Sequence, residues 1–123
     1  MKKNHNRISS FKFAWKGIVS AWKTEPNFKI HFILLALTIT AGFLFHINST
    51  EWIMIVMVAA GVLAMEIMNT AIETLTDLVS PEYHALAGKT KDLSAAAVLV
   101  FTIGAALTGL FIFVPKIYSL LFS

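Results

Sequence analysis

Long apolar runs, separated by short polar stretches, dominate the chain. The runs cover about residues 28–47, 52–79 and 95–118. Each is long enough to cross a hydrocarbon core of about 30 Å as a helix, which takes about 20 residues. The pattern therefore predicts three transmembrane helices. They are joined by a turn at residues 48–50 and by a loop at 80–92, which holds a proline, a glycine and several charges.

The segment before the first run has a different pattern. Between about residues 8 and 24, bulky apolar residues recur at i, i+4, i+7 and i+11, and the lysines lie largely elsewhere on the helical wheel. This pattern is typical of an amphipathic helix that lies in the membrane interface. Pro26 indicates that this helix ends just before the proline, because the residue before a proline avoids helical geometry. Glu25 is therefore expected at a corner. The bulky residues are Phe11, Trp15, Ile18 and Trp22.

Composition supports a single membrane-embedded domain over residues 1–123. The chain is 57% hydrophobic and only 14% charged, unlike an ordinary soluble domain. It has no cysteine, which excludes disulfides, thiolate metal sites and a cysteine nucleophile. Three short helices give little internal shielding for polar groups in lipid, so we expect a homo-oligomer. No nucleic-acid partner is expected.

The basic residues predict an orientation in the cell membrane. Seven lysines and arginines precede or open the first run, and Lys89 and Lys91 lie in the 80–92 loop. The opposite side receives Lys116. Because cytoplasmic segments carry an excess of such charges, we expect the N-terminus and the 80–92 loop in the cytoplasm.

Four polar residues form a stripe on the second run: Glu66, Asn69, Glu73 and Asp77. At 100° per residue they fall within an arc of about 80°. An acidic side chain at the centre of a membrane helix costs at least about 2.5 to 3.5 kcal/mol, so the stripe needs partners, protonation or a bound cation. It spans roughly 16 Å along the helix. The stripe therefore connects the membrane interior with the cytoplasmic side.

Acids together with basic donors at this end favour metal–phosphate chemistry. A pair of carboxylates can hold Mg²⁺ while nucleotide phosphates supply the other oxygens. We expect Glu25 and Glu73 at the same depth, as the metal pair. The deeper Glu66 is placed to accept a proton from a lipid hydroxyl that attacks a terminal phosphate. The nearby loop residues are Glu82, Tyr83, His84, Lys89, Lys91 and Asp92.

Three other interpretations stay open at this point. The stripe could serve helix packing, with His31 among the groups able to answer it, or it could line a small channel or proton-coupled transporter. Against a channel, residues 53–65 of the same helix are apolar throughout. The chain could also be a structural subunit, which would tolerate Glu66→Gln.

Several of these residues carry a resemblance to a known family. The run Glu66-Ile67-Met68-Asn69-Thr70-Ala71-Ile72-Glu73 resembles the prokaryotic diacylglycerol kinases, a family of small membrane lipid kinases. The similarity extends over nearly the whole chain. It also includes Trp15-Lys16-Gly17, Glu25 with Asn27-Phe28, Asp77, Glu82-Tyr83-His84 and Lys91-Asp92.

The resemblance implies a homotrimer with composite active sites that take ATP from the cytosol and a lipid alcohol from the bilayer. Glu66 resembles the catalytic base, and Glu25 and Glu73 resemble the Mg²⁺-coordinating pair. The implied nucleotide-binding residues are Glu25, Asn69, Glu73, Glu82, Tyr83, His84, Lys91 and Asp92.

Other positions resemble one branch of the family. The 24–28 corner, Glu51-Trp52 and Val114-Pro115-Lys116 look like the Gram-positive branch, which phosphorylates undecaprenol, and His31 replaces an acidic residue of the Gram-negative branch. Undecaprenol is therefore the favoured acceptor, with diacylglycerol as the alternative. Phe13 and Asn6 depart from the pattern of some members, which leaves the N-terminal nucleotide contacts undecided.

Overall fold

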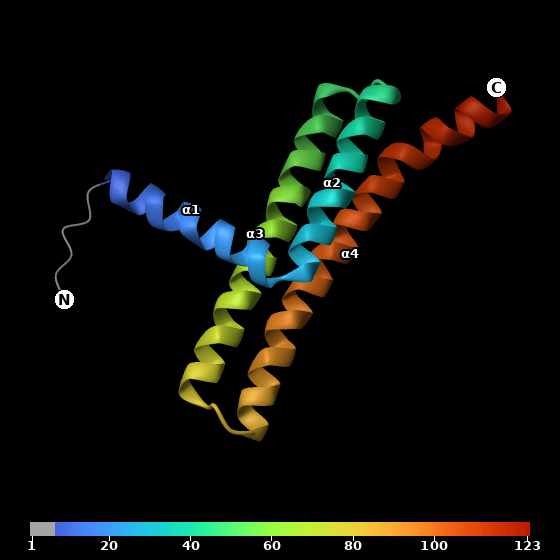
Figure 1. Cartoon of the computed structure of the whole chain (residues 1–123). Coiled ribbons are helices and arrows are strands. Elements are labelled where there is room, and N and C mark those ends of the chain that lie inside the picture. The colour runs from blue at the N-terminus through green and yellow to red at the C-terminus, as the bar shows by residue number, and fades with distance from the viewer. Residues whose placement is uncertain (1–6) are drawn as a thin grey trace.

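The computed structural model describes residues 7–123, which form four helices (Figure 1). They are α1 (Arg7–Thr24), α2 (Pro26–Leu44), α3 (Ser49–Val79) and α4 (Ala85–Phe122). The last three are long and apolar enough to cross a membrane. The predicted all-α class and the three long apolar helices are confirmed. Asn6, one of the two positions that depart from the family pattern, lies outside the residues that the structure describes.

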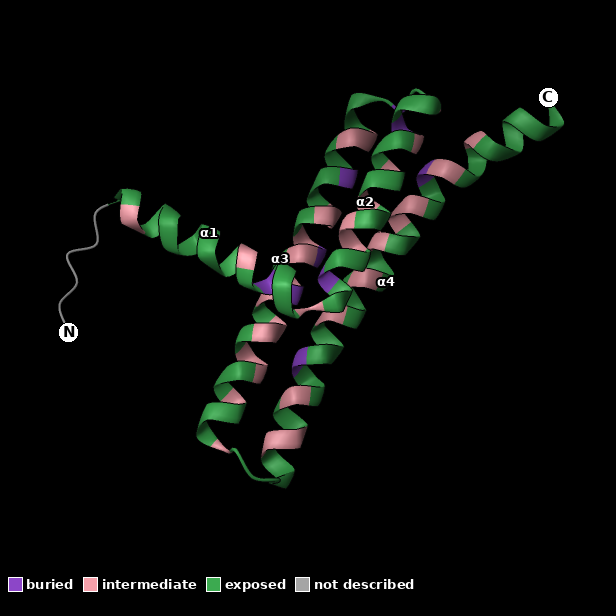
Figure 2. Cartoon of the chain, viewed as in Figure 1, coloured by how far each residue is buried: buried purple, intermediate pink, exposed green. Residues whose placement is uncertain are grey.

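The three long helices are organised around α3. α3 and α4 run antiparallel and pack along each other, while α2 lies against α3 and α1 leaves the bundle sideways at the α1–α2 corner (Figure 1). Large apolar side chains are exposed on every helix, and buried residues are few (Figure 2). Such a surface suits lipid or further copies of the chain as its surroundings. The membrane-surface position of α1 stays a prediction.

The turn between α2 and α3 lies earlier than expected. α2 ends at Leu44 because His46 takes a left-handed φ of 52°, and the amide of Ile47 then bonds back to the carbonyl of Gly42 at 3.1 Å. Asn48 Oδ1 accepts the amide hydrogen of Glu51 at 2.9 Å. This side chain caps α3, which therefore begins at Ser49, where a turn was expected.

The expected loop at 80–92 is mostly helical. α4 begins at Ala85, ten residues before the predicted start at 95, because His84 Nδ1 accepts the amide hydrogen of Leu86 at 3.1 Å and caps the helix. Lys89, Lys91 and Asp92, which indicated a loop, lie on the first turns of this helix, and Glu82 lies in the connection before it. Gly88, Lys89 and Thr90 are likewise helical.

A small core holds the ends of the three long helices that lie away from the α3–α4 loop. It contains Ile47, Ile55 and Ile112, with Phe45, Trp52 and Phe113 packed against it. Beside it, Lys116 Nζ lies 3.0 Å from Glu51 Oε2, and both side chains are largely shielded. This ion pair joins the start of α3 to the end of α4. It gives a structural role to Lys116, the basic residue that was expected on the side opposite the N-terminus.

Gly61 allows α3 to approach α4 closely. A Cβ at this position would lie 1.9 Å from Cζ of Phe101, so the ring would have to leave its place. We expect Gly61→Ala to lower the free energy of unfolding by about 1 to 3 kcal/mol, the usual cost of overpacking. Denaturant unfolding in detergent measures it. The control is Gly104→Ala on α4, whose Cβ meets nothing within 4 Å; equal stability of the two variants would contradict the prediction.

Candidate active site

Glu66 is a buried carboxylate that is paired with a histidine on another helix. The residue is 4% exposed, and its Oε1 lies 2.9 Å from Nε2 of His31 on α2. An ionised carboxylate can only accept hydrogen bonds, so Nε2 carries the hydrogen when Glu66 is charged. The contact satisfies a buried oxygen and fixes the orientation of the carboxylate. His31, one of several groups expected to answer the stripe, is therefore its partner within one chain.

Asn69 and Glu73, one and two turns further along α3, are linked to each other, and Asn69 is also linked to α4. Asn69 Nδ2 lies 3.4 Å from Glu73 Oε1, and the hydroxyl of Ser94 donates to Asn69 Oδ1. Ser94 is buried. Its bond to the amide oxygen turns the NH₂ group toward Glu73. The sequence analysis did not identify Ser94 as a site residue. In the sequence it stands out only as a hydroxyl residue at the start of an apolar run.

Glu25 faces the acidic residues of α3 from the α1–α2 corner. Burial raises the pKa of the Glu25 carboxyl above its usual value, and the negative charges of Glu73 and Glu66 raise it further. Carboxylates that repel one another in this way are stabilised by a cation between them. The charge of Glu73 thus acts on Glu25, and their role as a metal pair stays a prediction.

The donor set fits a magnesium ion that is shared with a phosphate. Within residues 7–123, no group of three or more histidine or acidic side chains is placed to hold a metal by itself. Mg²⁺ commonly takes one or two carboxylates and completes its shell with substrate phosphates and water. Two carboxylates such as those of Glu25 and Glu73 are the number and kind of protein ligands that such a site needs.

The other residues that were predicted to bind the nucleotide lie closer to the connection between α3 and α4. Lys91 Nζ is 2.5 Å from Oδ1 of Asp77, which holds the lysine beside the stripe, and Asp92 is exposed. Glu82, Tyr83 and His84 lie on the connection itself, at the lower end in Figure 1. α3 continues for about 9 Å beyond Glu73 before it ends. Within one chain, the α3–α4 connection therefore does not reach the carboxylates of Glu25 and Glu73.

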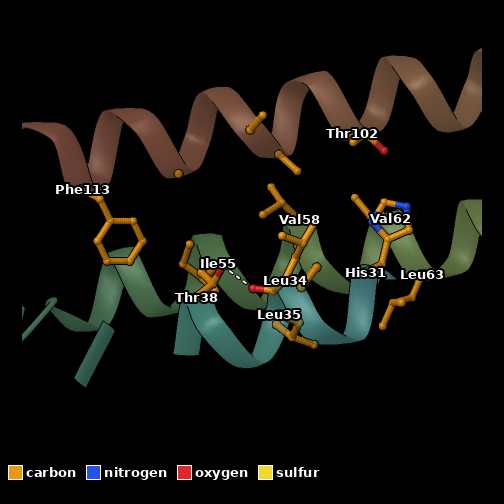
Figure 3. Close-up of a pocket in the computed structure, with 14 residues that line it drawn as sticks. His31, Leu34, Leu35, Thr38, Ile55, Val58, Val62, Leu63, Thr102 and Phe113 are labelled. Carbon is orange, nitrogen blue, oxygen red and sulfur yellow. Dashed lines mark hydrogen bonds between the residues drawn. The ribbon is translucent and has the colours of Figure 1, made fainter. Parts of the chain in front are cut away.

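A mainly apolar cavity of about 280 Å³ lies between α2, α3 and α4 (Figure 3). His31 lines one end of it together with Leu63 and Thr102, and Phe113 lines the other end. Glu66 is not part of the lining, but its partner His31 is. The site therefore joins an acidic, phosphate-compatible cluster to an apolar space through one histidine.

The fold and site define an all-helical protein with three helices suited to a membrane and a carboxylate cluster next to an apolar cavity. Residues 12–113 match the family model of the prokaryotic diacylglycerol kinases. The undecaprenol kinase of Bacillus subtilis is 38% identical over 110 residues, which is 89% of each chain. The chain therefore belongs to the prokaryotic diacylglycerol kinase family and is a lipid kinase.

Two further relatives are named diacylglycerol kinases. The diacylglycerol kinase of Synechocystis is 36% identical over 117 residues, covering 94% of this chain and 67% of that protein. The diacylglycerol kinase of Escherichia coli is 31% identical over 101 residues, covering 82% and 83%. Family membership sets aside the channel and structural-subunit interpretations.

Proposed function

We propose that this chain transfers the terminal phosphoryl group of ATP to the hydroxyl of a membrane lipid alcohol. The observation that carries the proposal is the buried Glu66 carboxylate, held by His31 at 2.9 Å between the acidic cluster and the apolar cavity. A carboxylate in this position can act as the general base for a hydroxyl that arrives from the membrane.

The proposed mechanism is direct in-line transfer. Glu66 takes the proton of the lipid hydroxyl, and the lipid oxygen forms a bond to the terminal phosphorus while the bond from that phosphorus to the bridging oxygen breaks and ADP leaves, without a phosphoenzyme. Mg²⁺, when bound by Glu25 and Glu73, offsets the charge of the phosphates. Asn69, positioned by Ser94, contacts the nucleotide. We assign further nucleotide contacts to Glu82, Tyr83, His84, Lys91 and Asp92.

The favoured acceptor is undecaprenol, which would make the product undecaprenyl phosphate. The support is the 38% identity to a Bacillus subtilis protein named undecaprenol kinase, together with the sequence features of the Gram-positive branch. Diacylglycerol is the second candidate, because the Synechocystis relative named diacylglycerol kinase is 36% identical.

We further propose that residues 1–123 form one lipid kinase domain that assembles as a homotrimer in the cell membrane. The exposed apolar side chains on all three long helices offer surfaces for neighbouring copies as well as for lipid. The N-terminus and the α3–α4 connection face the cytoplasm in this proposal, with α1 at the membrane surface.

The test is phosphoryl transfer by the purified protein in mixed micelles with Mg²⁺ and labelled ATP, offering undecaprenol and diacylglycerol separately. We expect faster phosphorylation of undecaprenol. Preference for diacylglycerol would reassign the acceptor within the family, and transfer to neither lipid would contradict the proposed function. Molar mass by light scattering in the same detergent tests the trimer.

Ser94→Ala tests the positioning of Asn69. Loss of one neutral hydrogen bond, worth about 1 kcal/mol, should raise KM for ATP roughly fivefold by leaving the Asn69 amide free to turn. The control is Thr90→Ala, because the hydroxyl of Thr90 donates to the carbonyl of Leu86 on its own helix. An unchanged KM for ATP in Ser94→Ala would show that this hydrogen bond does not serve nucleotide binding.

A further inference from the structure

The proton that Glu66 takes in the proposed mechanism has to leave a buried position. Transfer of a phosphoryl group to a hydroxyl releases one proton for each lipid that is phosphorylated, and this proton first moves to the general base. Glu66 is 4% exposed and lies about 20 Å along the helix from the end of α3 at Val79. A protonated carboxyl is no longer a base. Glu66 therefore needs a route to water before the next turnover.

His31 contacts Glu66 and is the more exposed of the two side chains. Its Nε2 lies 2.9 Å from Oε1 of Glu66, and the two side chains are 17% and 5% exposed. Within residues 7–123, neither the second ring nitrogen, Nδ1, nor the other carboxylate oxygen, Oε2, has a hydrogen-bond partner. Neither is among the buried atoms without a partner in that part of the chain, so both keep some accessible surface. Oε2 can thus receive a hydroxyl, and Nδ1 can exchange a proton with water.

His31 also lies close to the end of its own helix. α2 begins at Pro26, so His31 is about 8 Å along the helix from the α1–α2 corner. Pro26 and Asn27 are exposed there, at the point where α1 leaves the bundle (Figure 1). In the proposed arrangement α1 lies at the membrane surface, so this corner meets water. The route from Glu66 to water through His31 is therefore shorter than the one along α3.

Acidic side chains near this pair favour a transient positive charge on His31. The carboxyl of Glu25, at the corner, is repelled by the charges of both Glu66 and Glu73, so the three acids lie within electrostatic reach of one another. Within residues 7–123, no lysine or arginine forms an ion pair with them. Negative surroundings of this kind stabilise an imidazolium. The basic side chains that flank this region are Lys23 on α1, Lys29 on α2, which lies over the ring of Trp22, and Lys91 on α4, which pairs with Asp77.

We propose that His31 is a proton relay that carries the proton from Glu66 to water and so resets the base after each turnover. Glu66 takes the proton of the hydroxyl. The ring, whose own hydrogen exchanges with water and moves to Nδ1, then accepts the proton from the carboxyl at Nε2. The resulting imidazolium releases the Nδ1 proton to water, and Glu66 is charged again. One proton leaves the hydroxyl and one reaches water. The inference rests on the proposed function and gives a positioning residue, His31, a second task.

His31→Gln separates proton relay from orientation of the base. The glutamine amide can donate the same hydrogen bond to Glu66, but it cannot accept a proton. A residue that only orients Glu66 would therefore keep wild-type kcat in this variant. We expect kcat to fall about tenfold or more, less than the 10²-fold to 10⁴-fold contribution of the base itself, while KM for ATP stays unchanged.

Rapid mixing with a pH indicator measures the release of the proton directly. In the wild type, the proton should reach the solvent together with the phosphorylated lipid, and in His31→Gln it should lag behind the first phosphorylated lipid at each site. His46→Asn is the matched control, because it removes a histidine from the turn after α2, where the φ of 52° is one that asparagine tolerates. Wild-type kcat together with simultaneous proton release in His31→Gln would overturn the proposal.

His31→Ala is a second variant that does not depend on how glutamine fits. It leaves space beside Glu66, where added imidazole can carry protons as the side chain does. Imidazole should raise kcat of His31→Ala in a saturable way, whereas acetamide, which donates a hydrogen bond but carries no proton, should not. Equal rescue by the two compounds, or rescue by neither, would contradict the relay. Wild-type protein that phosphorylates neither undecaprenol nor diacylglycerol would contradict the proposed function, whereas loss of these differences in an active enzyme contradicts the relay alone.

Discussion

Replacing Glu66 by glutamine is expected to lower kcat for lipid phosphorylation by about 10²-fold to 10⁴-fold, the usual contribution of a general base. Glutamine has nearly the same shape and can still pair with His31, but it cannot take the proton of the attacking hydroxyl. Assembly and ATP binding should therefore persist. The measurements are labelled phosphate transfer under saturating substrates, light scattering for the oligomer and equilibrium binding of ATP.

The matched control is Glu51→Gln, which neutralises another shielded carboxylate on the same helix. Glu51 pairs with Lys116 at the end of α3 that lies away from the acidic cluster, so its replacement should affect stability and not the chemical step. Full transfer activity in Glu66→Gln would refute the assignment of the base. Loss of the oligomer in Glu66→Gln would instead support the packing interpretation of the stripe.

Glu73→Gln is expected to raise the Mg²⁺ concentration needed for half-maximal activity by about tenfold or more. A contact to a charged group is worth about 1.5 to 3 kcal/mol, and each 1.4 kcal/mol changes an affinity about tenfold. Glu25→Gln should act in the same direction, because the two side chains approach the ion from α3 and from the α1–α2 corner. Activity titrated with Mg²⁺ at fixed ATP measures both variants.

Asp77→Asn provides the comparison for this metal prediction. It removes an acid of the same stripe that is engaged with Lys91, so the dependence on Mg²⁺ should change less than in Glu73→Gln. Normal magnesium dependence in both Glu25→Gln and Glu73→Gln would exclude them as the metal pair. A large effect of Asp77→Asn alone would move the metal site along α3.

Much of the fold could be predicted from the sequence because the membrane restricts it. A crossing helix needs about 20 apolar residues, so the three runs alone determine the number of long helices. Helical periodicity places Glu66, Asn69 and Glu73 on one face, since all three belong to one element. The α3–α4 connection was predicted poorly: Gly88 and the charged residues around it indicated a loop, but they fit the first turns of a helix that His84 caps.

Contacts between helices were decided by the tertiary structure. The partner of Glu66 lies 35 residues away and that of Asn69 lies 25 residues away, and no local pattern states which residues meet at such separations. The depth of His31 relative to Glu66 follows from how α2 lies against α3. The cavity likewise depends on the spacing of three helices. The sequence by itself thus determined the helices, the acidic stripe and the family resemblance. The packing of α2 and α4 on α3 decided which polar side chains pair and where an apolar space remains, because helix spacing and register are properties of the whole bundle.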